Sequence, residues 1–174
     1  MKKAFLVSLV VLFSAISFAQ NKYVGVNSCV CHNLPKQGKQ MEVWKNSKHA
    51  QAFEVLKSEQ ATKYATAKEI KGSPTEAKEC LECHTTGYGQ PAEKSFDMTK
   101  GVQCEECHGA ASGYKAIHNK PENKEKAVAA GLMLHKDDAK FCQGCHVSKM
   151  HDVKAFDYKK MWEQIKHPLP AAKG

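Results

Sequence analysis

The stretch Gly101-Val-Gln-Cys104-Glu-Glu-Cys107-His108-Gly109 decides how this chain folds, because it contains a Cys-x-x-Cys-His motif. This motif is the attachment signature of a c-type haem, in which two sulfurs bond the porphyrin and the histidine ligates the iron. Residues i and i+3 lie on the same face of a helix, so both sulfurs can reach one porphyrin edge. The stretch therefore predicts a short helix beside a haem.

The motif occurs three times in full and once in a form shortened by one residue, and together the copies use all eight cysteines. The other copies are Cys80-Leu-Glu-Cys83-His84, Cys142-Gln-Gly-Cys145-His146 and the shortened Cys29-Val-Cys31-His32. A single copy could equally be a zinc site or a disulfide. Neither alternative needs a histidine after every second cysteine, so the repetition favours haem c with its iron. We expect four haems, three of them at full motifs.

The shortened motif differs from the others because its cysteines are two residues apart, and such side chains point to nearly opposite sides of a helix. Two thioethers from this spacing would need a distorted or extended backbone. We expect His32 and a single thioether, from Cys31, to hold the haem, because Cys31 precedes the histidine as in the full motifs. The alternatives are a strained double attachment, loss of this haem, or a strained disulfide between Cys29 and Cys31.

Five of the nine histidines lie outside the motifs and are candidates for the second iron ligand. Ser47 is a suitable N-cap, which places His49 in the first turn of a helix expected to run to about Glu69. His167 precedes Pro168, a residue that disfavours helical geometry before it, and so ends a helix expected over 157–166. We expect His49 and His167 to be distal ligands.

The remaining three histidines have weaker signals. His118 lies in a lysine-rich stretch and His151 follows the fourth motif, and both are kept as further candidate ligands. His135 falls in a loop and is expected to be a solvated histidine. A helix is also predicted over 121–131, with a break at 71–75. The predicted fold is mainly α, a compact multihaem cytochrome c fold with long loops, in which haems form much of the core.

Residues 1–19 have the pattern of a secretory signal peptide. Lys2 and Lys3 precede an apolar run over 4–16, and small residues near Ala19 offer a cleavage site. The run is shorter than the roughly 20 apolar residues of a spanning helix, so no membrane span is expected after cleavage. Residues 20–174 would form one multihaem domain. Because c-type haem is attached outside the cytoplasm, we expect a periplasmic protein.

The chain has a net charge of +8, and all 26 of its basic residues are lysines. Nucleic-acid binding is not expected, because there is no arginine-rich stretch and no basic helix with interleaved aromatic residues. Haem propionates would balance much of this charge. The remaining lysines predict docking to redox partner proteins with acidic faces, and haem-mediated self-association is a further hypothesis.

Four stretches are similar to the cytochrome c-554 family of multihaem cytochromes, and the third motif, Gly101-Val-Gln-Cys104-Glu-Glu-Cys107-His108-Gly109, adds to the likeness. They are Tyr23-Val-Gly-Val, Trp44-x-x-Ser47-x-His49-Ala, Cys80-Leu-Glu-Cys83-His84-Thr-Thr-Gly87-Tyr and Ile165-Lys-His167-Pro168. The resemblance implies a mostly helical tetrahaem fold with stacked haems and periplasmic electron transfer. In the best-known members, which serve ammonia oxidation, three haems have two axial histidines and one is five-coordinate.

The resemblance also implies iron ligands. The motif histidines would be proximal ligands, with His49 and His167 as matching distal ligands, whereas His118 and His151 are not transferred. The first hypothesis for function is therefore an electron-transfer protein. The alternative is a reductase of a small molecule such as nitric oxide, at a haem that lacks a distal ligand. A structural link in a larger cytochrome assembly is a third hypothesis.

Overall fold

The computed structural model describes residues 20–135, 138–146, 151 and 156–168. The signal peptide expected over 1–19 lies outside the described residues. Helices and long loops make up the described part of the chain, where the one extended pairing is an isolated bridge between Tyr23 and Ala92. The prediction of a mainly helical fold with long loops is confirmed.

Short helices of two kinds alternate along the chain. The 3-10 helices are η1 Val26–Asn33, η2 Pro35–Gln37, η3 Glu54–Lys57, η4 Met98–Lys100 and η5 Pro121–Asn123. The α-helices are α1 Gln40–Lys45, α2 Glu59–Ala67, α3 Lys78–His84, α4 Cys104–His108, α5 Lys124–Ala129, α6 Ala139–His146 and α7 Tyr158–Ile165. None of these described helices is long and apolar enough to cross a membrane.

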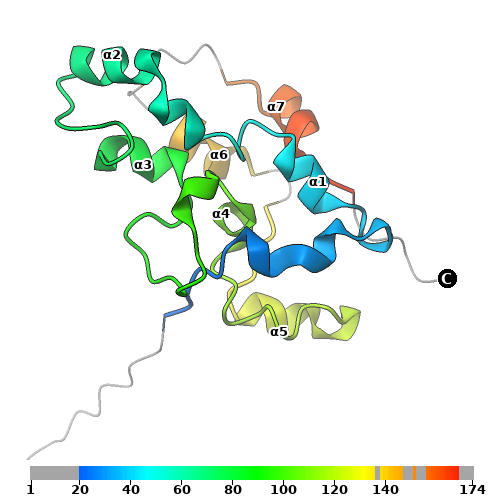
Figure 1. Cartoon of the computed structure of the whole chain (residues 1–174). Coiled ribbons are helices and arrows are strands. Elements are labelled where there is room, and N and C mark those ends of the chain that lie inside the picture. The colour runs from blue at the N-terminus through cyan, green and yellow to red at the C-terminus, as the bar shows by residue number, and fades with distance from the viewer. Residues whose placement is uncertain (1–19, 136–137, 147–150, 152–155, 169–174) are drawn as a thin grey trace, which may run out of the picture.

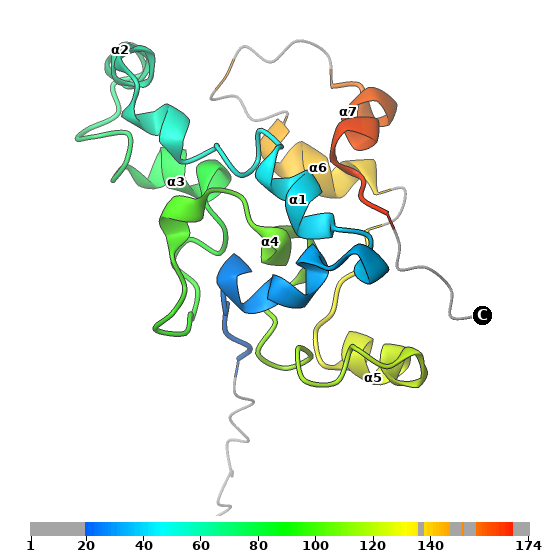
Figure 2. The same ribbon diagram turned by 45° about the vertical axis from the view of Figure 1, so that its right-hand side comes forward.

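The elements are arranged around α4, which lies at the centre of the molecule in both ribbon views (Figures 1 and 2). The blue segment η1 runs past one side of α4. Helices α2 and α3 lie together at one end, α5 lies at the opposite end, and α7 lies near α1. This arrangement brings the four motifs, which are far apart in sequence, into one region.

Each full motif forms a short α-helix that ends at the motif histidine, as the i, i+3 spacing predicts. The shortened motif lies instead in the 3-10 helix η1, where Cys29 leaves helical geometry with φ −104° and ψ 22°. The backbone at this motif is thus distorted, which is the condition stated above for two thioethers, and the number of thioethers stays a prediction. A 3-10 helix has about three residues per turn, so it changes the directions of Cys29 and Cys31 relative to an α-helix.

The single helix predicted from Ser47 to about Glu69 is wrong. Ser47 donates its hydroxyl to the Trp44 carbonyl at 2.7 Å and caps nothing, and turns follow it. The cap is at Ser58, whose side chain accepts a hydrogen bond from the Ala61 amide at 3.1 Å and begins α2. A serine hydroxyl can cap a helix or bond to the local backbone. Ser47 bonds to the local backbone, and the His49 carbonyl accepts from the Val102 amide, so the helix is capped by Ser58 instead.

The other predicted elements are close to those observed. η5 and α5 cover the segment predicted over 121–131, and Gly131 follows with φ +105°, as expected for a glycine that ends a helix. Helix α7 begins after Asp157, whose side chain accepts from the Lys160 amide. The break predicted over 71–75 separates α2 from α3.

The apolar core of the described residues is small. One cluster gathers Val24, Ala111, Tyr114 and Ala127, and the other gathers Phe53, Leu56 and Leu81, with Met98 packed against it. Met98 is thus a packing residue here. Between the clusters, polar side chains hold the chain together.

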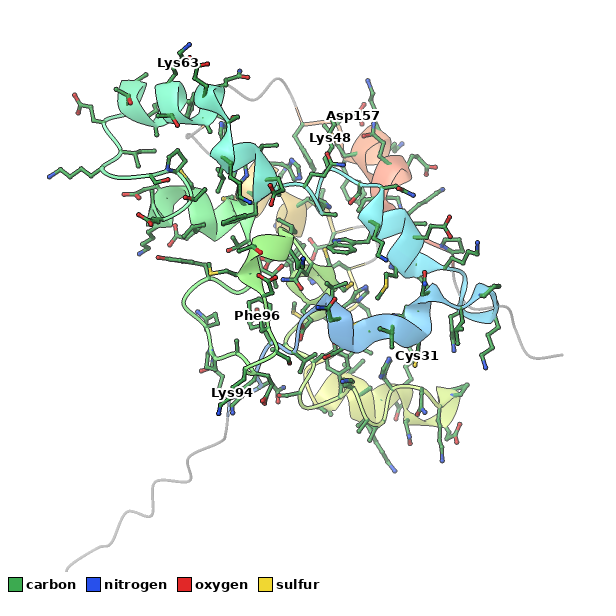
Figure 3. All side chains as sticks on the ribbon, in the orientation of Figure 1. Cys31, Lys48, Lys63, Lys94, Phe96 and Asp157 are labelled. Carbon is green, nitrogen blue, oxygen red and sulfur yellow. The ribbon has the colours of Figure 1, made fainter. Side chains whose placement is uncertain are left out.

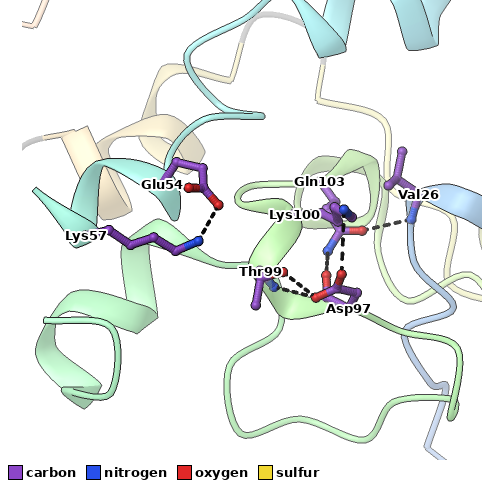
Figure 4. Close-up of polar contacts among 7 residues, drawn as sticks. All are labelled: Val26, Glu54, Lys57, Asp97, Thr99, Lys100 and Gln103. Atoms are coloured by element: carbon purple, nitrogen blue, oxygen red, sulfur yellow. Dashed lines mark hydrogen bonds and ion pairs between the residues drawn. The ribbon is translucent and has the colours of Figure 1, made fainter. Parts of the chain in front are cut away.

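Buried polar side chains join η1 to α4. Gln103 accepts from the Val26 amide at 2.8 Å and donates to the Asp97 carbonyl at 2.9 Å (Figure 4). Glu105, which is 1% exposed, accepts from the amides of Val24, Gly25 and Ala111. These bonds set the position of the first motif against the third.

Candidate functional site

The histidines named from the sequence come together in four pairs. Each pair joins one motif histidine to one histidine from outside the motifs, with ring centres 5.8 to 5.9 Å apart. The pairs are His32 with His118, His146 with His49, His84 with His151, and His108 with His167. The sequence named all eight residues, but nothing in it said which histidine would face which.

The spacing within the pairs can be compared with what a metal requires. Metal–imidazole bonds are about 2 Å long, so two imidazoles on opposite sides of one metal ion have ring centres about 6 Å apart. The observed separations are close to that value, and all four pairs agree within 0.1 Å. The pairs therefore fit irons ligated by histidine from both sides.

Several ring orientations are held by backbone carbonyls. The Nδ1 atom of His84 lies 2.7 Å from the Ala52 carbonyl, and that of His118 lies 2.8 Å from the Lys115 carbonyl. His108 makes a longer contact of this kind, 3.3 Å to the Met133 carbonyl. A carbonyl only accepts, so Nδ1 carries the hydrogen and Nε2 keeps its lone pair. This is the tautomer that a metal ligand needs.

Burial favours the neutral form of four of the paired histidines. Burial lowers the pKa of His32, of His49 and of His146, and neighbouring histidines lower the first two further. Burial also lowers the pKa of His108, opposed in part by the hydrogen bond to Met133. A neutral imidazole has a free lone pair, so these side chains are ready to bind iron near neutral pH.

A cavity of about 210 Å³ at the second motif tests whether a haem fits. Cys80, His84 and His151 all line it, and α2 supplies one wall with Tyr64 and Ala65. The Tyr64 hydroxyl is buried and has no hydrogen-bond partner among the described residues. A thiol, two imidazoles, apolar walls and an unpartnered hydroxyl are together the side-chain chemistry that suits a haem, whatever the volume of the cavity.

A second cavity, of about 450 Å³, lies between η1 and α1. Val26, Val30, Met41 and Trp44 line it, with lysines at Lys45 and Lys100, but its lining contains no histidine or cysteine. The smaller cavity is therefore the better match to the motif chemistry.

The cysteine thiols show which motifs are neighbours. The Cys104 thiol is hydrogen-bonded to Cys29, which raises the pKa of Cys104. The pKa of Cys145 rises to about 12 through burial and then through Cys83, which also hydrogen-bonds to it. Burial and then the nearby Cys142 raise the pKa of Cys107 to about 11. The motifs thus lie in the spatial order first, third, fourth, second.

All eight cysteines are free thiols in this structure, including Cys29 and Cys31. Cys29 is half-buried, whereas Cys31 is exposed. No group of three or more His, Cys, Asp or Glu side chains in the described ranges is arranged as a bare metal site. The thiols are thus unpaired beside the histidine pairs, where a porphyrin could bond them.

His135 corrects one prediction. Instead of being solvated, its side chain is 19% exposed, its ring stacks on Phe141 at 3.8 Å, and its Nδ1 lies 3.1 Å from the Asp138 carboxylate. Phe141 lies six residues after His135 and directly before the fourth motif, and no local pattern indicated this contact. It is the one histidine of the described residues outside the four pairs.

Tyr64 is a site residue that no local sequence pattern indicates. Its ring stacks on His151, with ring centres 5.0 Å apart and an angle of 28°. An aromatic residue on α2 has no sequence relation to a histidine nearly ninety positions later, so only the tertiary structure could reveal the contact.

Comparison with known proteins finds a family and a relative that this chain resembles. The family model described as cytochrome c554 and c-prime matches residues 28–109. Cytochrome c-554 of Nitrosomonas europaea is 30% identical over 136 residues, which are 68% of this chain and 54% of that protein. The chain thus spans about half the length of this curated relative.

A solved structure gives the same result for the fold. The reduced state of cytochrome c554 from Nitrosomonas europaea superposes with a TM-score of 0.59 at 24% identity, covering 85% of each chain. The helical fold and its attachment motifs define a c-type cytochrome. Within that class, these matches support the cytochrome c-554 family for this chain. The cytochrome c class implies covalently bound c-type haem with its iron.

Proposed function

We propose that this chain is a periplasmic electron-transfer protein that carries a c-type haem at each of its four motifs. The observation that carries the proposal is the set of four histidine pairs, each combining one motif histidine with one other. When bound, each haem supplies an iron that gains and loses one electron reversibly. The similarity to the cytochrome c-554 family is in accord with this role.

The residues of the chain would divide the work of holding the haems. The motif cysteines would bond the porphyrin, and the paired histidines would ligate its iron. Carbonyls such as those of Ala52 and Lys115 hold the imidazoles in the ligating tautomer. The apolar side chains that line the cavity, including those from α2, would exclude water and leave the iron in surroundings of low polarity.

The contacts between thiols support a continuous path for electrons from one haem to the next. Neighbouring motifs approach closely enough for hydrogen bonds between the thiols of Cys29 and Cys104 and between those of Cys83 and Cys145. Haems attached to these cysteines would be neighbours in the order first, third, fourth, second. Electrons would enter at one end of this series and leave at the other.

Partners and location follow from the surface and from the start of the chain. Lys48, Lys63 and Lys94 lie on separate parts of the outer surface (Figure 3). Such lysines would attract redox partners with acidic faces, and this attraction weakens with salt.

Residues 1–19 would direct export and residues 20–174 would form the haem domain. Haem-mediated self-association stays a hypothesis.

Intact-mass measurement of the protein produced with haem-attachment machinery tests the haem number. We expect the mass of the chain without residues 1–19 plus four haems, and reversible reduction in a redox titration. Because Cys31 precedes His32 as in the full motifs, Cys31→Ser should release the first haem under denaturing conditions. Cys29→Ser should keep it.

Other results would be equally clear. Retention of the first haem in both variants would mean attachment by two thioethers, because either bond alone would hold it. A wild-type mass with three haems would mean that the shortened motif binds none. A wild-type protein without covalent haem would contradict the proposal. The alternative of a nitric oxide reductase is not favoured, because every motif histidine faces another histidine.

A further inference from the structure

The second motif offers the most detailed view of a haem site in this chain. His84 ends α3 and His151 faces it from the segment between α6 and α7, with ring centres 5.9 Å apart. Both side chains line the cavity that also contains Cys80. One cavity therefore presents the attachment thiol and two opposed imidazoles.

His84 is held firmly from behind. Its Nδ1 donates to the Ala52 carbonyl at 2.7 Å, a contact that spans thirty-two residues and ties α3 to the turns before η3. Its Nε2 is thereby left to face the cavity. The fixed ring defines the direction from which a second ligand must come.

His151 is held by an aromatic ring. Tyr64 stacks on it with ring centres 5.0 Å apart and an angle of 28°, and Tyr64 lies in α2, whose N-cap is Ser58. Aromatic pairs of this kind contribute about 0.5–1.5 kcal/mol beyond the area they bury. The stacking restricts the imidazole to orientations that face His84.

The Tyr64 hydroxyl adds an independent observation. It is buried in this region without a hydrogen-bond partner among the described residues, and such a group is costly unless something in the cavity satisfies it. Tyr64 thus contacts His151 with its ring and offers a donor to whatever occupies the cavity.

We infer that His151 closes the second haem site of this chain to outside ligands, and that Tyr64 is the positioning residue that holds His151 in place. The inference rests on the proposed function, since it requires a haem on Cys80 and Cys83. It differs from the five-coordinate haem that the family resemblance implies. An iron with two imidazoles has no coordination position left for a diatomic gas.

The test is the electron paramagnetic resonance spectrum of the oxidised, haem-loaded protein, together with carbon monoxide binding to the reduced protein. We expect the wild type to be entirely low-spin and to bind no carbon monoxide. His151→Ala should turn one haem in four high-spin and bind one carbon monoxide per protein. His135→Ala, which alters the histidine outside the pairs, should match the wild type.

The measured haem mass distinguishes a failure of this inference from a failure of the proposed function. A fully loaded wild type with a high-spin haem, or a His151→Ala variant with an unchanged spectrum, would overturn the inference and leave the proposed function intact. A wild type whose second motif carries no haem would overturn both.

The role of Tyr64 has its own pair of variants. Tyr64→Leu removes the stacked ring and should give a partly high-spin second haem and measurable carbon monoxide binding, with the haem mass unchanged. Tyr64→Phe keeps the ring and should remain low-spin. A Tyr64→Leu protein as fully low-spin as the wild type would show that Tyr64 does not position His151.

Discussion

Glu105, in the middle of the third motif, joins distant parts of the chain through a single carboxylate. Its Oε1 accepts from the amides of Val24 and Ala111 at 2.9 and 2.8 Å, and its Oε2 accepts from Gly25 at 2.6 Å. No cation is needed, because three backbone amides satisfy the charge. Since Cys104 and Cys107 flank it, the same helix turn carries both the haem attachment and the tie to η1.

Replacing Glu105 by glutamine should destabilise the haem-loaded protein by about 3 kcal/mol. Whichever oxygen becomes an amide nitrogen then faces a backbone N–H donor, and both groups lose their partner inside the protein. Chemical denaturation at neutral pH measures the change.

The matched control is Glu106→Gln on the next residue. The Glu106 carboxylate accepts one longer bond, 3.2 Å from the Gly87 amide, and burial raises its pKa, so a neutral side chain is better tolerated there. Equal losses in the two variants would contradict the role given to Glu105.

At the scale of elements, η4 shows how a cap links local structure to pH. Asp97 accepts from the amide and the hydroxyl of Thr99 at 3.0 and 2.6 Å, and it lies 3.8 Å from the Lys100 ammonium (Figure 4). These hydrogen bonds, mainly that of the Thr99 hydroxyl, lower the pKa of Asp97 below 3.8. The cap acts while the carboxylate is ionised.

Asp97→Asn should therefore cost about 1 kcal/mol at neutral pH, the usual worth of such a cap. Because the pKa is lower in the folded state, the unfolded chain takes up the proton first as pH falls. The stabilisation is present above about pH 4 and disappears as pH falls through the folded pKa. The denaturant midpoints of the two proteins should differ more at pH 7 than at pH 3, because part of the stabilisation is lost as pH falls toward the lowered pKa of Asp97. A constant difference would contradict this role.

At the scale of the whole molecule, the core is small for the length of the chain. Only eleven apolar residues are buried among those that the structure describes, and several of them are alanines. A domain of this size normally buries much more apolar surface. The cavity at the second motif and the four histidine pairs lie where the missing interior would be.

We expect a haem-free variant, with all eight cysteines changed to alanine, to lose its cooperative thermal transition and more than half of its far-ultraviolet helical signal. Haem binding would then be part of the folding energy, as metal binding is in small metalloproteins. The haem-loaded wild type under the same conditions is the reference. Cooperative unfolding of the variant at the wild-type midpoint would show that the polypeptide core is sufficient.

Several features could be predicted from local patterns. The motif helices, the break at 71–75, α5 and α7 depend on spacing and caps within a few residues, so neighbouring positions contain the information. The helix predicted from Ser47 was wrong because both Ser47 and Ser58 could cap, and the His49 carbonyl, bonded to the Val102 amide at 2.9 Å, favours turns after Ser47. That bond joins segments about fifty residues apart.

By itself, the sequence determined the attachment chemistry, the mainly helical class and the eight histidines available to iron, because Cys-x-x-Cys-His is a local motif whose meaning depends on spacing. Only the tertiary structure decided which histidines face each other, that His135 is packed on Phe141 while the other eight are paired, and that Tyr64 stacks on His151. Apart from His135 and Phe141, which are six residues apart, these contacts join residues far apart in the chain. Such pairings depend on how the loops close and the helices pack, and no pattern of neighbouring residues encodes them.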